Sequence, residues 1–141
     1  MGAVDPTREA MAAFAALPQD QPIAMINLLR FRARADYPAD HPLHAAETSG
    51  AEAYAAYGRA AAAPFARAGG SQVWLGRPTS TLIGPTDEQW DLAFIAEYPS
   101  ATAFLAMLRD EDYRAAVIHR QAAVLDSRLI RCDPMQRPAW G

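Results

Sequence analysis

The sequence at residues 23–31 is IAMINLLRF, an almost continuous apolar stretch with a single amide, Asn27, near its middle. Its length and its lack of alternation predict a strand that is covered on both faces. A second stretch, WDLAFIAEY at residues 90–98, alternates from Leu92 to Tyr98 between two sides of a strand. These two strands fix the fold, because a sheet built on them needs cover on both faces.

Working outward from these strands, capping and turn signals divide the rest of the chain. Asp5 and Pro6 are typical of a helix start, and Ser49 with Glu52 forms a capping box for a long helix. Helices are predicted from Asp5 to Leu17, from Ser49 to Ala68, from Ser100 to Arg109 and from Asp110 to Val124. Further strands are predicted at 72–75, with a continuation at 81–83 after Pro78, and at 126–132.

The predicted order is a helix at 1–19, a core at 20–132 and an irregular tail at 133–141, all in one domain spanning 1–141. Within the core, strand, helix, strand, strand, helix and strand follow one another, which is typical of a ferredoxin-like βαββαβ fold. Right-handed crossovers then place the helices on one face of a four-stranded antiparallel sheet. The other face is apolar and lacks cover, so we expect an α+β homodimer that joins two sheets face to face.

Composition excludes several function classes. The 13 residues counted as Lys+Arg are all arginine, which rules out lysine Schiff-base chemistry and a P-loop. The formal charge of −3 argues against a nucleic-acid partner. No apolar run is long enough to cross a membrane, and no signal peptide is recognised, so a cytoplasmic location is expected. Cys132 is the only cysteine, which leaves no intramolecular disulfide.

The unit EYPS at residues 97–100 and the segment DEDYRAAVIHR at 110–120 make the chain recognisable. With residues 23–32 and 50–70, these segments resemble the family known as domain of unknown function 1330. That resemblance implies membership of the dimeric α+β barrel superfamily over roughly residues 20–132. Relatives in that superfamily include cofactor-free monooxygenases, isomerases and haem-dependent peroxidases, but a shared fold does not transfer their chemistry.

Arg120 is the most unusual candidate residue. Tyr113, Val117 and Arg120 lie on one helical stripe, which directs the arginine toward the sheet. The guanidinium could clamp an anion or carbonyl group, or it could form a structural ion pair or extend out to solvent. Asn27 could orient a ligand carbonyl or satisfy a neighbouring hydroxyl.

Three aromatic residues complete the predicted ligand-binding set with Asn27 and Arg120. Tyr54 and Tyr57 face the sheet from the long helix, where they either belong to the core or present hydroxyls to a polar-lined cavity. Trp74 lies on the second strand, in the core or at the dimer interface.

His119 is the best-placed acid–base candidate, although it projects about 100° away from Arg120 around the helix. We therefore list His119 and Arg120 as catalytic candidates, and His119 is the only candidate for a helical haem ligand. His41 and His44 are a weak hint of a metal, since a loop does not preorganise them. No metal and no cofactor is predicted.

Two function classes follow. The first is a small-molecule binder, or a cofactor-independent enzyme of the monooxygenase or isomerase kind, acting on a carbonyl or carboxylate compound between helices and sheet. In the enzyme version His119 is the base and Arg120 stabilises the developing charge. The alternative is a non-catalytic dimeric scaffold or regulatory module, which predicts no ligand pocket.

Overall fold

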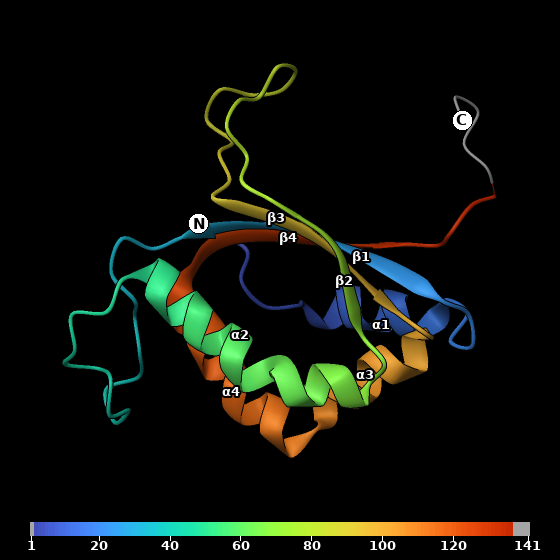
Figure 1. The fold of residues 1–141 in the computed structure, drawn as a ribbon, viewed down its shortest axis with the longest axis horizontal. Coiled ribbons are helices and arrows are strands. Elements are labelled where there is room, and N and C mark those ends of the chain that lie inside the picture. The colour runs from blue at the N-terminus through green and yellow to red at the C-terminus, as the bar shows by residue number, and fades with distance from the viewer. Residues whose placement is uncertain (1, 137–141) are drawn as a thin grey trace.

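The computed structural model describes residues 2–136, and Figure 1 shows its helices lying on one side of a single sheet. The elements in chain order are α1 (Arg8–Ala16), β1 (Ile23–Phe31), α2 (Gly50–Arg67), β2 (Ser71–Gly76), β3 (Leu92–Tyr98), α3 (Ala101–Arg109), α4 (Glu111–Ala123) and β4 (Val124–Cys132). The four strands are arranged in the order β2-β3-β1-β4, and every neighbouring pair is antiparallel. This order confirms the predicted α+β, ferredoxin-like fold.

β1 is a central strand, as its apolar sequence predicts. It pairs with β3 from Ile23↔Tyr98 to Leu29↔Leu92, and it pairs with β4 on its other side. Ile23 and Leu29 are each 1% exposed, because they point into the space between the sheet and the helices. The core therefore lies on the helix side of the sheet.

The helix layer is built on two capped helices. The Ser49 hydroxyl accepts from the Glu52 amide while the Glu52 carboxylate accepts from the Ser49 amide, so the predicted capping box at the start of α2 is confirmed. Asp110 caps α4 by accepting from the Asp112 amide. α2 and α4 pack together, and all four helices lie on one face of the sheet (Figure 1).

Two local predictions need correction. α1 is capped by Thr7, whose hydroxyl accepts from the Ala10 amide, and not by Asp5, whose carboxylate accepts from Gln121 of α4 instead. The segment 81–83 does not continue β2, because pairing with β3 ends at Gly76 and residues 77–91 contain no strand or helix. Residues 133–136 of the predicted tail are irregular, and 137–141 lie outside the described residues.

Candidate functional site

A cavity of about 780 Å³ lies between the helix layer and the sheet. Its walls come from all four strands of the sheet on one side and from α2, α3 and α4 on the other. The N-terminal segment, residues 3–7, and α1 cover the remaining side, with Met11 and Phe14 among the lining residues. Ligand pockets in proteins commonly measure 300–1,000 Å³, so the cavity is large enough for a small molecule.

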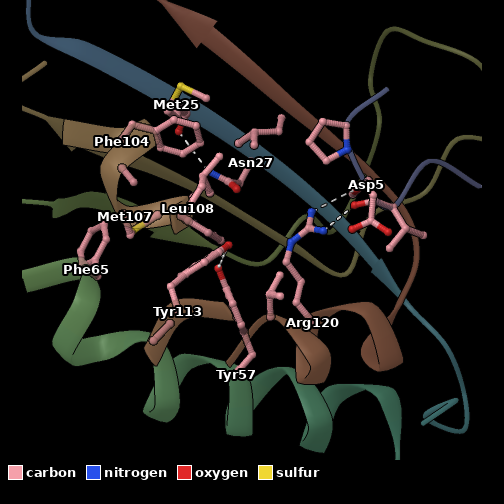
Figure 2. A pocket seen from close by; sticks show the side chains of 18 of the residues that line it. Asp5, Met25, Asn27, Tyr57, Phe65, Phe104, Met107, Leu108, Tyr113 and Arg120 are labelled. Carbon is pink, nitrogen blue, oxygen red and sulfur yellow. Dashed lines mark hydrogen bonds between the residues drawn. The ribbon is translucent and has the colours of Figure 1, made fainter. Parts of the chain in front are cut away.

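One end of the cavity is apolar and aromatic. Figure 2 shows Met25, Phe65, Phe104 and Met107 grouped at this end, which also includes Tyr98. Phe65 meets Tyr98 edge to face at 5.6 Å between ring centroids, and Tyr98 meets Phe104 in the same way at 5.1 Å. This packing fixes the aromatic wall, which can contact only an apolar part of a ligand closely.

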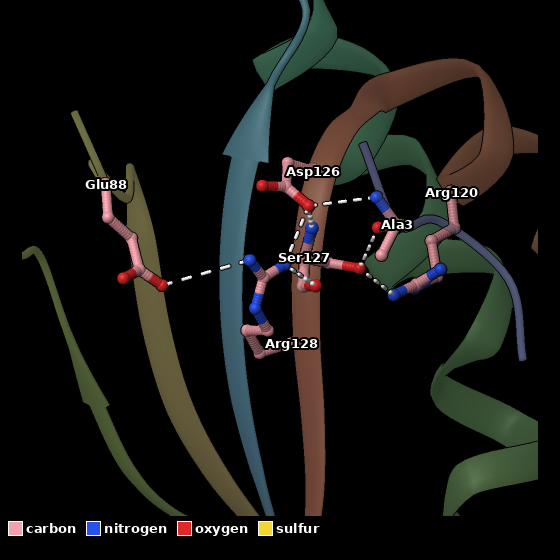
Figure 3. Close-up of polar contacts among 6 residues, drawn as sticks. All are labelled: Ala3, Glu88, Arg120, Asp126, Ser127 and Arg128. Atoms are coloured by element: carbon pink, nitrogen blue, oxygen red, sulfur yellow. Dashed lines mark hydrogen bonds and ion pairs between the residues drawn. The ribbon is translucent and has the colours of Figure 1, made fainter. Parts of the chain in front are cut away.

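The other end holds the Arg120 guanidinium, as Figure 2 shows. Its Nη1 donates to the Val4 carbonyl at 2.5 Å, and its Nη2 donates to the Ser127 hydroxyl at 3.3 Å. The Ser127 hydroxyl in turn donates to the Ala3 carbonyl at 2.7 Å (Figure 3). Arg120 therefore joins α4 to β4 and to the N-terminal segment through neutral oxygens.

The charge of Arg120 is not neutralised by an ion pair within residues 2–136. Asp126 is nearby, but its carboxylate accepts from the Ala3 amide and from Arg128 (Figure 3), and the Ala3 contact is the main reason that its pKa is lowered. Asp5 lines the same end of the cavity, yet its carboxylate bonds to Gln121 and forms no ion pair with Arg120. A partly buried cation without a carboxylate partner favours an anionic or strongly polar ligand group.

Arg131 also lines the cavity, from β4, but unlike Arg120 it forms an ion pair with a carboxylate. Its side chain is only 7% exposed, its Nε pairs with Asp133 at 3.2 Å, and its Nη2 donates to the Pro18 carbonyl at 2.6 Å. The guanidinium carbon lies 4.9 Å from the centre of the Phe14 ring. Its Nη1 is buried and has no hydrogen-bond partner in the described part of the chain. Arg131 therefore holds α1 in place, with its charge offset by Asp133.

Tyrosine hydroxyls supply further polar groups in the middle of the cavity. The hydroxyls of Tyr57 and Tyr113 are 3.0 Å apart and point toward one another in Figure 2. Burial raises the pKa of Tyr57 and of Tyr54 well above the usual range, and the neighbouring Tyr113 adds to the rise for both. These residues are therefore neutral donors and acceptors, not bases.

Asn27 also lines the cavity, from β1. Its Nδ2 donates to the carbonyl of Met25 in the same strand at 3.1 Å. Among residues 2–136 its amide oxygen has no hydrogen-bond partner, so it remains free to accept a bond from a ligand.

The structure brings together four of the residues selected from the sequence, since Asn27, Tyr54, Tyr57 and Arg120 all line the cavity. Their roles in binding remain predictions. Trp74 does not line the cavity: it lies opposite Ile95 and is 53% exposed on the face of the sheet away from the helices.

His119 also lies outside the cavity. Its Nδ1 is 2.7 Å from the Tyr37 hydroxyl, and its ring meets His41 edge to face at 5.9 Å. The long loop at residues 32–49 folds back onto α4 and brings Tyr37 and His41 to His119. Burial lowers the pKa of His119, and the charges of His41 and Arg59 lower it further. His119 therefore anchors this loop and does not share a ligand space with Arg120.

Sequence reasoning missed Ser127, Arg131 and the N-terminal segment, all of which line the cavity. Ser127 gave a usable signal, because a polar residue on the inward side of a strand needs a partner when it is buried. Residues 3–7 gave none, since their sequence shows no periodicity. Within residues 2–136 no group of three or more His, Cys, Asp or Glu side chains is arranged to hold a metal ion.

Comparison with known proteins gives a family and solved relatives. A family model described as Domain of unknown function (DUF1330) matches residues 43–131. The chain is similar to a crystal structure of RPA0582, a protein of unknown function from Rhodopseudomonas palustris, with 55% identity and a TM-score of 0.89, covering 97% of this chain and 100% of that one. A structure of the methylated RPA0582 protein gives 54% identity and a TM-score of 0.90, with 98% of each chain covered.

A more distant likeness is to a dimeric protein of unknown function with a ferredoxin-like fold from Bacteroides fragilis. It is 13% identical with a TM-score of 0.48, and the match covers 79% of this chain and 95% of that chain. No curated protein matches the sequence. Among residues 2–136, none of the helices has the length and apolar character needed to cross a membrane.

Proposed function

This chain belongs to the Domain of unknown function (DUF1330) family, and we propose that it is a homodimer that binds a small molecule with an acidic or carbonyl head and an apolar body. The proposal is carried by the Arg120 guanidinium, which lines a mainly apolar cavity and forms no ion pair within the described residues. A ligand carboxylate would supply the counter-charge that the described residues do not.

The two ends of the cavity support a ligand with two chemically different parts. Arg120 and Ser127 offer hydrogen-bond donors at one end, while Phe65 and Phe104 form an apolar wall at the other. Between them, Asn27 offers a free amide oxygen and Tyr57 a neutral hydroxyl. A few well-placed polar groups in an apolar pocket orient a ligand, and the apolar wall contributes the larger buried area.

Neither of the other functions considered from the sequence has support from this arrangement. A scaffold without a ligand pocket predicts a filled interior, which a cavity of about 780 Å³ does not fit. An enzyme using His119 as a base needs that side chain within hydrogen-bond reach of the substrate, and His119 lies outside the cavity. Among the described residues that line the cavity there is no histidine or glutamate, and the one carboxylate, Asp5, already accepts a hydrogen bond from Gln121, so we propose binding without acid–base chemistry.

The homodimer is supported by the face of the sheet that the helices leave uncovered. One cross-strand row on this face consists of Trp74, Ile95, Ile26 and Ile130, in the order β2-β3-β1-β4. Trp74 is 53% exposed and Ile130 is 47% exposed. An apolar row across a whole sheet favours burial, and a second copy offers the same apolar face in an isologous contact.

Calorimetric titration with a matched pair of probes tests the binding proposal. Phenylbutyrate and phenylbutanol share an apolar body and differ in the charged head. We expect the carboxylate to bind at least about tenfold more tightly than the alcohol, because Arg120 is a cation without a counter-charge. Arg120→Met keeps an apolar stem of similar length and should abolish this preference.

Arg114→Met is the matched control, since Arg114 is an exposed arginine of the same helix and does not line the cavity. It should leave both affinities unchanged. Equal affinity of the wild-type protein for the two probes, or an unchanged preference in Arg120→Met, would contradict the proposal. Loss of the native circular dichroism spectrum in Arg120→Met would instead assign Arg120 a structural role.

A further inference from the structure

We propose that residues 77–91, called the arm from here on, reach over the second copy in the homodimer and bury their tip against it. The inference rests on the proposed homodimer and adds a contact that the sheet face alone does not provide. The partner is a second copy of this chain.

The arm projects from the sheet on the side where the second copy is proposed to lie. Figure 1 shows it rising from the ends of β2 and β3, away from the helix layer. It contains no helix or strand. The arm therefore extends away from the sheet on its uncovered side and does not fold back over the core of its own copy.

The base of the arm is fixed to this same face. Arg128 of β4 lies opposite Leu28 in the register, next to the row formed by Ile26 and its neighbours. Its guanidinium stands 5.1 Å from the centre of the Trp90 ring and 3.9 Å from the Glu88 carboxylate, as Figure 3 shows for Glu88. These contacts set the direction in which the arm leaves the sheet.

The arm's other anchor is Asp91. Its amide donates to the Leu29 carbonyl at 2.7 Å, and its carboxylate accepts from the Phe31 amide at 2.8 Å. The base is thus bonded to β1 and β4, while the tip makes no comparable contact with the rest of residues 2–136.

The tip carries two of the most exposed apolar side chains of the described residues. Leu82 is 93% exposed and Ile83 is 92% exposed, and no charged residue occurs between residues 79 and 86. Gly84 follows with φ +151°, a conformation that favours glycine and turns the chain directly after the two aliphatic residues. A charge-free turn that holds two aliphatic side chains away from its own chain is suited to burial against another surface.

The second copy is the occupant favoured by continuity. The arm rises from the sheet away from the helices (Figure 1), and the row through Ile26 faces the same way because Met25 and Asn27 line the cavity on the helix side, so one partner can cover both. The partner also offers apolar surface along its edge strand β2, where Val73, Trp74 and Leu75 are each at least half exposed. In a two-fold symmetric dimer both arms make this contact, which doubles the apolar area buried.

Sedimentation equilibrium of the full chain provides the test. We expect the double substitution Leu82→Ser with Ile83→Ser to raise the dimer dissociation constant at least about tenfold with no change in the circular dichroism spectrum. Leu17→Ser, at a 45% exposed leucine on the helix side, should leave the constant unchanged. A second measurement attaches a benzophenone to Ile83→Cys in a Cys132→Ser background, and irradiation should give a covalent dimer.

Three outcomes would overturn the inference, and they separate it from the proposed dimer. If the wild-type protein stays monomeric, both the proposed homodimer and the proposed arm contact are wrong. If Ile26→Asp splits the dimer but the double substitution leaves it unaffected, the arm contact alone is wrong and the proposed homodimer stands. Binding of the wild-type monomer to phosphatidylcholine vesicles, lost in the double variant, would assign the tip to a lipid surface instead.

Discussion

Two tyrosine hydroxyls, those of Tyr57 and Tyr113, face each other inside the cavity at 3.0 Å. Tyr113 is 8% exposed, so removing the hydroxyl of one residue leaves the other short of a partner in a largely apolar space. We expect Tyr113→Phe to lower the free energy of unfolding by about 1–2 kcal/mol. The double variant with Tyr57→Phe should recover most of this loss, because neither hydroxyl is then buried alone.

Urea unfolding of the two single variants, the double variant and the wild type measures the coupling between these hydroxyls. Strictly additive losses would show that the two hydroxyls do not depend on each other.

The environment of a second residue, His119, predicts that the free energy of unfolding depends on pH. Its pKa in the folded protein is below the ordinary value of 6.5, first because of burial and then because His41 and Arg59 are close. The unfolded chain therefore binds more protons than the folded one as the pH falls through about 6.5, and folding loses stability over that range. His119→Asn keeps an acceptor for the Tyr37 hydroxyl without the titration.

We expect the wild type to lose more free energy of unfolding than His119→Asn between about pH 7.5 and pH 5 in urea titrations. After correction for the intrinsic pH dependence of exchange, amide protection in the loop at 32–49 should fall over the same range in the wild type only. An equal loss in the two proteins would contradict this assignment.

Residues on regular elements were the ones that the sequence placed best. Helical projection directed Arg120 and Tyr57 to the sheet, and both line the cavity. Projection also turned His119 away from Arg120, but it could not predict that a long loop would return to cover it. The side of the sheet occupied by Trp74 depended on a register shift between Gln72 and Trp74, which no local pattern reveals.

At the scale of elements, α2 and α1 form a natural comparison. Both are N-capped by a hydroxyl side chain, Ser49 and Thr7, but α2 buries residues such as Ala53 and Ala61 while α1 buries none. Ser49→Ala should lower the global free energy of unfolding by about 1 kcal/mol, because α2 unfolds only with the core. Thr7→Ala should change it by no more than a few tenths, since α1 opens locally.

Denaturant titration measures the global effect, and amide exchange over residues 8–16 measures the local one. Faster exchange of α1 in Thr7→Ala without a shift of the denaturation midpoint is the expected pattern. Equal global losses for the two substitutions would mean that α1 is part of the cooperative core.

The starts of the helices also show which capping signals in the sequence predict a boundary correctly. The capping box placed the start of α2 correctly, because two side-chain bonds to the backbone act together there. Asp5 and Pro6 had the right types for a helix start, yet the chain continues extended to Thr7 because Asp5 bonds to Gln121. A cap is thus predictable when its partners are local, and not when a tertiary contact takes the side chain.

The whole molecule depends on what covers the outer face of the sheet. Apolar residues on both sides of β1 predicted this situation from the sequence, and the register places Ile26 between Ile95 and Ile130 on that face. The sequence predicted a pocket between the helices and the sheet, but not its volume, which depends on how α1 and residues 3–7 lie over the core.

The substitution Ile26→Asp tests directly whether a second copy covers the outer face of the sheet. An aspartate at the centre of the row would have to be buried without a counter-charge if two sheets met there, which is costly enough to separate them. We expect a monomer in sedimentation velocity at micromolar concentration, with the native circular dichroism spectrum retained. Ala60→Asp, on the exposed side of α2, should remain dimeric as the matched control. Because the cavity is lined by residues of one copy, the monomer should still prefer phenylbutyrate to phenylbutanol. A dimer that persists in Ile26→Asp would place the contact between copies elsewhere on the molecule.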